Sequence, residues 1–154
     1  MIKNFPVKLN SKHAAITQIK IADSLNANAV IIENKKLLTT RERGRKLCLM
    51  PGGGIETGET PKQTLIRELN EELGISVNQN NLEFIGEFSA PATGRKTVRK
   101  THLFLVKDHV GNIHPQNEIA EVKWISTKDL PKLSLEWILK HQIVPELLKR
   151  KLIS

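Results

Sequence analysis

The chain has 154 residues, of which 39% are hydrophobic and 26% are charged, and its formal net charge is +8. This length and composition are typical of a single globular domain over residues 1–154, and they exclude a disordered or collagen-like chain. No stretch is apolar enough for a signal-peptide core or a membrane span, so we expect a cytoplasmic protein without a membrane partner.

The positive charge favours a polyanionic partner, either a nucleic acid or a small phosphorylated molecule. Cations gather at residues 41–46, 94–100 and 149–151, where solvated surface charge is the simplest interpretation. The chain has no Tyr, four Phe and two Trp, which gives little support to RNA binding by base stacking. The single cysteine, Cys48, lies in the apolar run LCLM and is expected to be a small buried hydrophobe.

Short strands are predicted in the first third of the chain. Residues 28–32 and 37–40 are apolar or β-branched runs on either side of the turn-prone sequence ENKK, which indicates a hairpin. The run LCLM at residues 47–50 is predicted to be a third strand, which ends at Pro51 and three glycines.

A helix with well-defined ends is predicted over residues 61–73. Thr60 is a suitable N-cap, Gln63 completes a capping box, and Gly74 is suited to a left-handed residue after the last turn. Strands at 82–88, 101–106 and 120–126 follow, and then a helical stretch at 133–150 that Pro145 is expected to interrupt. This order indicates an α/β fold in which helices cover both faces of a mixed sheet.

The loop GGIETGETP before the helix resembles a phosphate-binding P-loop, but it has Glu59 where that motif requires Lys. A phosphate site in this loop therefore needs another source of positive charge. The glycines leave the backbone free to approach closely and to offer carbonyl oxygens, such as that of Gly53, to a metal ion.

The predicted helix carries an acidic face. Glu68, Glu71 and Glu72 fall within an arc of about 100°, where like charges repel one another and two of them also oppose the helix dipole. A solvated acidic face is one interpretation. The alternative is a divalent cation such as Mg²⁺, which takes carboxylate oxygens and completes its coordination with water and substrate phosphates. The loop and the helix together favour a metal-bridged phosphate site.

Nine positions between Gly53 and Ile75 resemble the complete signature of the Nudix hydrolase family, including its MutT-like members. The matching residues are Gly53, Glu59, Arg67-Glu68-Leu69, Glu71-Glu72 and Gly74-Ile75. The resemblance implies an α/β/α sandwich around a mixed β-sheet. It also implies hydrolysis of a nucleoside diphosphate linked to another group, with Mg²⁺ as the cofactor and Mn²⁺ as the alternative ion.

By position in the signature, the resemblance implies that Glu68, Glu71 and Glu72 are the metal-site carboxylates. Gly53 is the candidate for a carbonyl ligand to the same metal. Arg67 is expected to orient a glutamate by a charged hydrogen bond, and Glu59 to be structural or to lie in the outer shell.

A further catalytic or metal-binding glutamate precedes a late strand in many relatives. Glu118, six residues before Trp124, matches this placement best, and Glu121 is the second choice. An exposed loop acid is the alternative interpretation of Glu118. The general base stays open among Glu68, Glu118 and Glu121.

The substrate is indicated less directly. The sequence LMPGGGIETGE resembles small (d)NTP pyrophosphohydrolases, which we favour, whereas Pro91 resembles a proline of ADP-ribose pyrophosphatases, the first alternative. A non-catalytic module that binds RNA or a nucleotide is an alternative of another class, and RNA-cap removal is an intermediate case. The sequence leaves the oligomeric state undecided, with a homodimer among the alternatives. An aromatic side chain is expected to stack on the base, with Phe84, Phe88, Phe104, Trp124 and Trp137 as candidates.

Overall fold

The computed structural model describes residues 24–91 and 98–154. Its strands are β1 (Leu25–Val30), β2 (Ile32–Glu33), β3 (Lys36–Glu42), β4 (Gly52–Gly54), β5 (Leu82–Pro91), β6 (Val98–Val106) and β7 (Ile119–Ile125). Its helices are α2 (Pro61–Leu73) and α3 (Val144–Lys149), with a π-helical turn η3 (Leu139–Ile143) and the 3₁₀ turns η1 (Gln79–Asn81) and η2 (Leu130–Lys132).

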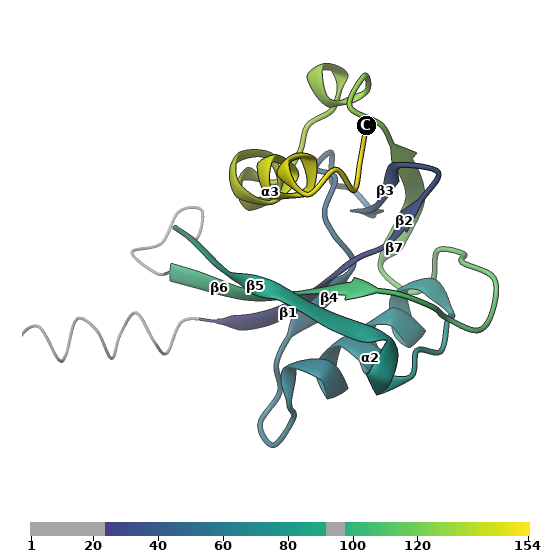
Figure 1. The fold of residues 1–154 in the computed structure, drawn as a ribbon. Helices are drawn as coiled ribbons and strands as arrows, with labels where there is room; N and C mark the ends of the chain where they lie inside the picture. Colours follow the sequence, from purple (N-terminus) through teal and green to yellow (C-terminus); the bar gives the residue numbers. More distant parts are fainter. Residues whose placement is uncertain (1–23, 92–97) are drawn as a thin grey trace, which may run out of the picture.

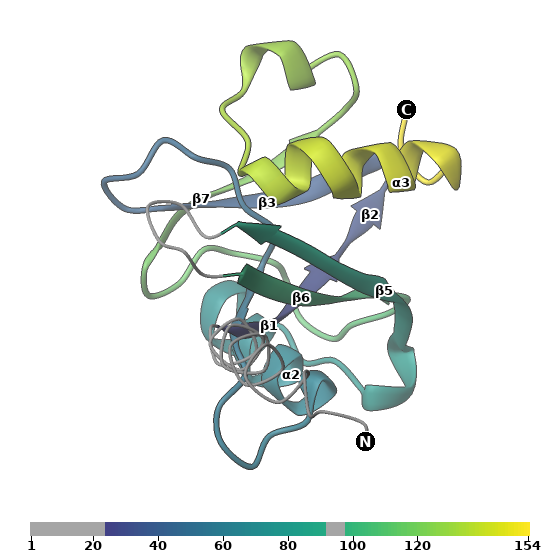
Figure 2. The same cartoon turned by 90° about the vertical axis from the view of Figure 1, so that its left-hand side faces the viewer.

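The strands form two sheets. The first has the order β4-β1-β6-β5, in which β1 is parallel to β6 and the other pairs are antiparallel. The second has the order β2-β3-β7 and is antiparallel. Helix α2 lies on one side of the first sheet and α3 on the other (Figures 1 and 2). The predicted α/β fold, with a mixed sheet between helices, is therefore confirmed.

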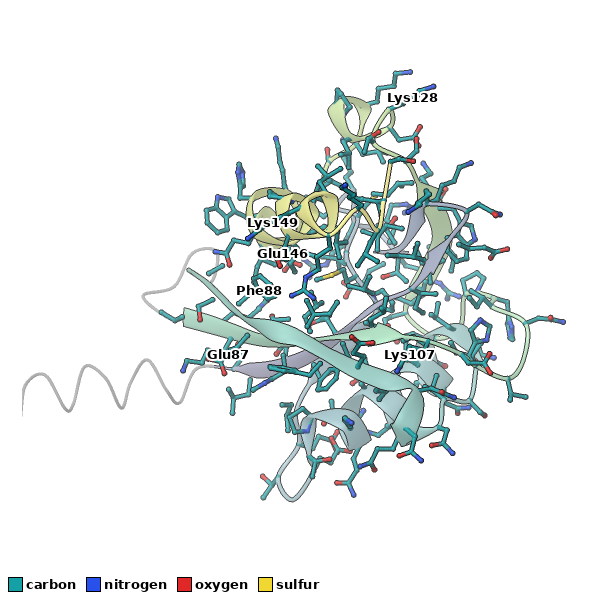
Figure 3. All side chains as sticks on the ribbon, viewed as in Figure 1. Glu87, Phe88, Lys107, Lys128, Glu146 and Lys149 are labelled. Carbon is teal, nitrogen blue, oxygen red and sulfur yellow. The ribbon has the colours of Figure 1, made fainter. Side chains whose placement is uncertain are left out.

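Each helix contributes to a separate hydrophobic core. On the α2 side, the fully buried Leu65, Leu69 and Leu73 pack against small residues of β1, Ala27 and Ala29. On the α3 side, a second core contains Val30, Leu37, Leu103, Ile125, Leu139, Ile143 and Leu147. Phe88 of β5 points from the sheet toward this second core (Figure 3). Burial of these side chains, at about 25 cal/mol per Å² of apolar surface, fixes both helices on the sheet.

The ends of α2 follow the prediction from sequence. Thr60 accepts a hydrogen bond from the backbone of Gln63, the Gln63 side chain bonds back to the Thr60 N–H, and Gly74 ends the helix at φ 66°. The predicted hairpin is also confirmed, because β2 and β3 are joined by Asn34 and Lys35, both with positive φ.

The predicted strand at residues 47–50 is wrong. Leu49 pairs with Thr40, whereas its neighbour Cys48 pairs with Leu135, so no two successive residues share one partner strand. The chain instead enters the first sheet after Pro51, where β4 pairs with β1. Cys48 is buried, as predicted.

Pro145 does not end the last helical stretch, but the stretch changes type just before it, from the π-helical turn η3 to α3, which has Pro145 in its first turn. Residues 137–149 are helical throughout, and the turn before Pro145 widens into η3. Because proline has no N–H to donate, a wider turn accommodates it without a break in the helix axis. In the part of the chain that the structure describes, no helix is long and apolar enough to cross a membrane.

Candidate metal centre and the adjoining pocket

Three carboxylates gather at the C-terminal half of α2. Glu68 and Glu72 lie one helical turn apart, and Glu118 reaches them from the loop before β7. Each offers an oxygen atom, and these atoms all lie within 4.8 Å of one another. Glu72 is 6% exposed, Glu68 is partly buried and Glu118 is exposed. We call Glu68, Glu72 and Glu118 the carboxylate cluster.

Backbone hydrogen bonds bring the Glu118 loop to α2. The Gln116 N–H donates to the carbonyl of Glu72 at 2.9 Å, and the Asn117 side chain donates to the carbonyl of Glu71 at 2.9 Å. These carbonyls belong to the last turn of the helix, where no N–H of the helix itself is left to donate to them. On its other side, the loop accepts a hydrogen bond at the Glu118 carbonyl from the Arg43 N–H at 2.9 Å. The position of Glu118 is therefore fixed by α2 and by Arg43, the residue that follows β3.

Glu72 has the most perturbed carboxyl group of the cluster. The Gly52 N–H donates to its Oε2 at 2.9 Å, yet burial raises its pKa to about 8, and the charges of Glu68 and Glu118 add to the increase. Burial disfavours the charged form of a carboxylate unless a cation balances it.

Glu68 lies against the glycine loop. Burial raises the pKa of its carboxyl group, opposed by a 2.9 Å hydrogen bond from Nη1 of Arg67 to Oε1. A Cβ atom on Gly53 would lie 2.5 Å from Oε1 of Glu68, so only glycine leaves room for this carboxylate.

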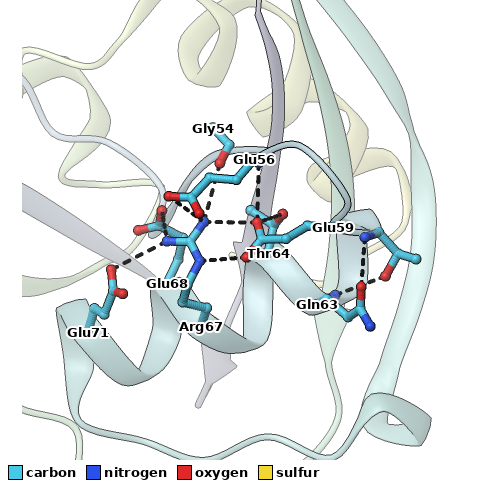
Figure 4. A network of polar contacts seen from close by, with 9 residues as sticks. Gly54, Glu56, Glu59, Gln63, Thr64, Arg67, Glu68 and Glu71 are labelled. Carbon is cyan, nitrogen blue, oxygen red and sulfur yellow. Dashed lines mark hydrogen bonds and ion pairs between the residues drawn. The ribbon is translucent and has the colours of Figure 1, made fainter.

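Arg67 is the centre of a polar network (Figure 4). Its Nε and Nη2 donate to the two oxygens of Glu59 at 2.8 and 3.0 Å, and Nη1 also lies 3.5 Å from Glu71. The Arg67 hydrogen bonds lower the pKa of Glu59 to about 2, with a further contribution from the Thr64 hydroxyl. Arg67 is thus held by one carboxylate while it donates to a member of the cluster.

Two candidate residues lie outside the cluster. Glu71 is half exposed on the Arg67 side of α2. Glu121 lies in β7 and accepts a 2.9 Å hydrogen bond from Arg41, which lowers the pKa of its carboxyl group. The geometry therefore brings together Glu68, Glu72 and Glu118 beside Gly53.

The predicted basic segments are partly neutralised. Arg41, Arg45 and Arg150 form ion pairs with Glu121, Glu42 and Glu146. Residues 94–97 of the second segment lie outside the described residues, as does the side chain of Pro91.

The carboxylate cluster fits a hard divalent cation. Its donors are oxygen atoms only, which suits Mg²⁺ or Mn²⁺ better than the nitrogen and sulfur ligands typical of zinc sites. Among residues 24–91 and 98–154, Arg67 is the cation paired with a member of the cluster, and of the three members it pairs only with Glu68. A cation bound at the carboxylate cluster would balance the negative charge of Glu68 and Glu72, the two members that are partly or fully buried.

A pocket of about 190 Å³ opens beside the cluster. Its lining residues are Asn26, Asn28, Glu42, Leu49, Met50, Gly52, Gly53, Arg99, Thr101 and Glu136. Glu136 and Arg99 form an ion pair at 2.6 Å, and burial raises the pKa of Glu136. None of the five candidate aromatic residues is among the described residues that line this pocket.

Sequence reasoning missed Glu136 and Arg99 because neither lies near the glycine loop in the chain. The parallel pairing of β1 with β6 places Arg99 close to the loop, and the bridge between Cys48 and Leu135 does the same for Glu136. A sequence signal for these contacts would require the strand order to be known first.

The metal-free protein is expected to lose stability as the pH rises from about 4.5 to 8. Glu72 ionises near pH 4.5 in the unfolded chain but only near pH 8 in the folded protein, so the folded state holds the extra proton and the free energy of unfolding falls across this range. Saturating Mg²⁺ should remove much of this loss. Urea denaturation at pH 5 and pH 8, with Mg²⁺ and with EDTA, measures the free energy of unfolding under each condition. If Mg²⁺ stabilised the protein equally at both pH values, the prediction would be contradicted.

Comparison with known proteins gives a family match over most of the chain. A family model described as NUDIX domain matches residues 24–147. An ADP-ribose pyrophosphatase of Methanocaldococcus jannaschii is 28% identical over 106 residues, which cover 68% of this chain and 62% of that protein. An RNA pyrophosphohydrolase of a Marinomonas species is 41% identical over 69 residues, which cover 43% of this chain and 42% of that protein.

Among solved structures, the solution structure of the ORF135 protein of E. coli has a TM-score of 0.68 and 24% sequence identity, covering 82% of this chain and 90% of that one. At this identity the similarity concerns the fold. The match to this chain spans less than two thirds of the length of the two curated relatives above.

Proposed function

This chain belongs to the Nudix family, and we propose that it is a Mg²⁺-dependent pyrophosphohydrolase that cleaves a diphosphate linkage in a nucleoside diphosphate derivative. The observation that carries the proposal is the carboxylate cluster, with two partly or fully buried members, next to a pocket of about 190 Å³. A phosphate chain at the cluster and a nucleoside in the pocket would use both features at once.

The cluster residues have separate roles in this proposal. Glu68, Glu72 and Glu118 hold the ion, Gly53 leaves room for Glu68, and Arg67 positions Glu68 through its hydrogen bond. When bound, Mg²⁺ supplies positive charge that offsets the negative charge of the phosphates and of the cluster. Glu71 lies outside the carboxylate cluster, and it accepts a hydrogen bond from Arg67, as Glu59 does.

The reaction is an in-line displacement at phosphorus. A water oxygen forms a new bond to a phosphorus atom while the bond from that phosphorus to the bridging oxygen breaks, and the leaving phosphate takes the bridging oxygen. The attacking water gives its proton to a glutamate. We favour the second carboxylate oxygen of Glu118 for this role, since only one of its oxygens is offered to the ion. Glu118 is exposed, so water reaches it, whereas Glu68 already accepts a hydrogen bond from Arg67.

Nucleoside triphosphates are the favoured substrates, which would give a nucleoside monophosphate and pyrophosphate. The pocket is small for a ligand with two nucleoside-sized ends, since most ligand pockets measure about 300–1,000 Å³. ADP-ribose is the second candidate, supported by the relative with that activity in its name and by Pro91 near the end of β5. RNA with a 5′-phosphate chain is a third, because another relative is named an RNA pyrophosphohydrolase.

A substrate panel tests the proposal. We expect release of pyrophosphate from at least one nucleoside triphosphate in the presence of Mg²⁺, and none after addition of EDTA. ADP-ribose, dinucleoside polyphosphates and 5′-triphosphorylated RNA complete the panel. Salt-sensitive RNA binding with no metal-dependent product from any substrate would overturn the enzyme assignment and favour a binding module.

A further inference from the structure

The last turn of α2 ends against residues 107–118, the loop between β6 and β7, which we call the Glu118 loop. Its His114 N–H donates to the carbonyl of Leu73, the last residue of the helix, at 3.1 Å, and further donors from the loop reach the two preceding carbonyls. Because a helix leaves its last carbonyls without N–H partners of its own, they need donors from outside. The segment that carries Glu118 supplies these donors.

The side chain of Gln116 adds two hydrogen bonds to this contact. Its amide faces the carbonyls of Asn70 and Glu71, and since a carbonyl can only accept, the group that faces them is the NH₂ group. It donates to these two carbonyls at 3.1 and 3.3 Å. The amide oxygen at the other end accepts a hydrogen bond from Nε2 of His114 at 2.7 Å. His114 therefore fixes the direction in which the Gln116 amide points.

Gly74, the residue that follows α2, leaves the space that these two side chains occupy. A Cβ atom on Gly74 would lie 2.4 Å from Cε1 of His114 and 3.0 Å from the nearer end of the Gln116 amide. The imidazole ring and the amide thus lie directly on the backbone at the end of the helix. With no side chain between them and the backbone, the Glu118 loop is held close to α2.

We propose that Gln116 is a positioning residue for the reaction and that His114 orients it. The Gln116 side chain ties the Glu118 loop to the helical turn that carries Glu72, so that Glu68, Glu72 and Glu118 can reach one ion. Because the Glu118 side chain is exposed, its position depends on the backbone of the loop. This inference rests on the proposed function, which takes Glu118 as a metal ligand and as the group that receives the proton.

The first test is the variant Gln116→Met, in which methionine keeps the length of the side chain but cannot donate to the two carbonyls. At saturating Mg²⁺ we expect kcat to fall by roughly 10-fold or more with little change in KM, as happens when a group that orients a metal ligand is removed. The affinity for Mn²⁺ should fall by a similar factor. Isothermal titration with Mn²⁺ measures this affinity without turnover.

Gln142→Met is the matched control. The Gln142 side chain also donates to a backbone carbonyl, that of Ser89, at 2.8 Å, but it belongs to η3, on the opposite side of the first sheet from α2 (Figure 1). Its kcat and its Mn²⁺ affinity should equal those of the unmodified chain.

A double-mutant cycle separates positioning from a general loosening of the helix end. If Gln116 acts through Glu118, then Gln116→Met should have no further effect on kcat or on Mn²⁺ affinity in a chain that already carries Glu118→Ala. A change that only weakened the end of α2 would reduce both quantities with and without the Glu118 side chain.

The variant His114→Phe tests the orienting role of His114. Phenylalanine keeps a ring beside Gly74 but has no N–H for the Gln116 amide, so kcat and Mn²⁺ affinity should fall in the same direction as for Gln116→Met. The two changes together should cost no more than Gln116→Met alone, because both remove one arrangement of the amide. His141→Phe is the control, since the His141 ring packs on Trp137 in the last helical stretch. If Gln116→Met does not fold, His114→Phe with and without Glu118→Ala decides in the same way.

The outcomes separate the inference from the proposed function. Equal kcat and equal Mn²⁺ affinity for Gln116→Met and Gln142→Met would overturn the inference and leave the proposed function standing. Equal losses with and without the Glu118 side chain would also overturn it, because Gln116 would then act on the helix alone. Failure of every substrate in the panel overturns the proposed function, whereas the Mn²⁺ affinities still decide whether Gln116 positions Glu118.

Discussion

Glu72→Gln is expected to reduce Mg²⁺-dependent hydrolysis by roughly 100-fold or more and, at the same time, to stabilise the metal-free protein at pH 8. The loss of activity follows from the loss of a charged ligand in the carboxylate cluster. The gain in stability has a separate cause. Ionisation of a buried carboxyl group whose pKa is about 8 opposes folding, and glutamine has no charge to bury.

The size of the stability gain depends on pH. At pH 8 it should reach up to about 4 kcal/mol, since each pKa unit corresponds to about 1.4 kcal/mol, and it should vanish as the pH falls below 4.5. The glutamine side chain keeps an oxygen for the Gly52 N–H, so that hydrogen bond should survive. Urea denaturation in EDTA and turnover in Mg²⁺ measure the two effects, with Glu146→Gln as the control. A variant that keeps full turnover, or that is destabilised at pH 8, would contradict the assignment of Glu72.

Gly53→Ala is expected to impair metal binding with little change in stability. The new methyl group would meet the end of the Glu68 side chain, which is flexible and can turn away from the cluster. We expect the affinity for Mg²⁺ or Mn²⁺ to fall by roughly 10- to 100-fold, as it does when a group that orients a ligand is removed.

Gly54→Ala is the matched control for this prediction. A Cβ atom on Gly54 would have its nearest contact at 4.0 Å, with the side chain of Asn26, so the neighbouring position tolerates alanine. Isothermal titration of both variants with Mn²⁺ makes the comparison. Equal affinities for the two variants would show that the space beside Glu68 is unimportant for the ion.

Local sequence features predicted the central helix and most of its acidic face. The caps of α2 depend on residues three or four apart, which sequence spacing reveals directly. The same spacing could not separate Glu71 from its neighbours. Glu68 and Glu72 lie four residues apart and face β4, whereas Glu71 is turned about 100° from Glu72, toward Arg67.

Contacts between distant segments could not be predicted in the same way. The resemblance ranks Glu118 above Glu121, but the contact of Glu118 with Glu68 and Glu72 depends on hydrogen bonds from residues 116 and 117 to the end of α2. The ion pair of Glu136 and Arg99 depends on the order of the strands in the sheet. Residues 47–50 do not form a strand because Leu49 pairs with Thr40 while Cys48 pairs with Leu135. Each of these features is set by tertiary packing, which local propensity does not encode.

The most direct test of the metal centre is a crystal structure of the protein with Mn²⁺, in which anomalous scattering locates the ion. We expect an anomalous peak within bonding distance of carboxylate oxygens from Glu68, Glu72 and Glu118. The peak should disappear in crystals of Glu72→Gln at the same Mn²⁺ concentration. A peak bound elsewhere, with these three carboxylates unliganded, would contradict the proposal that they hold the catalytic cation.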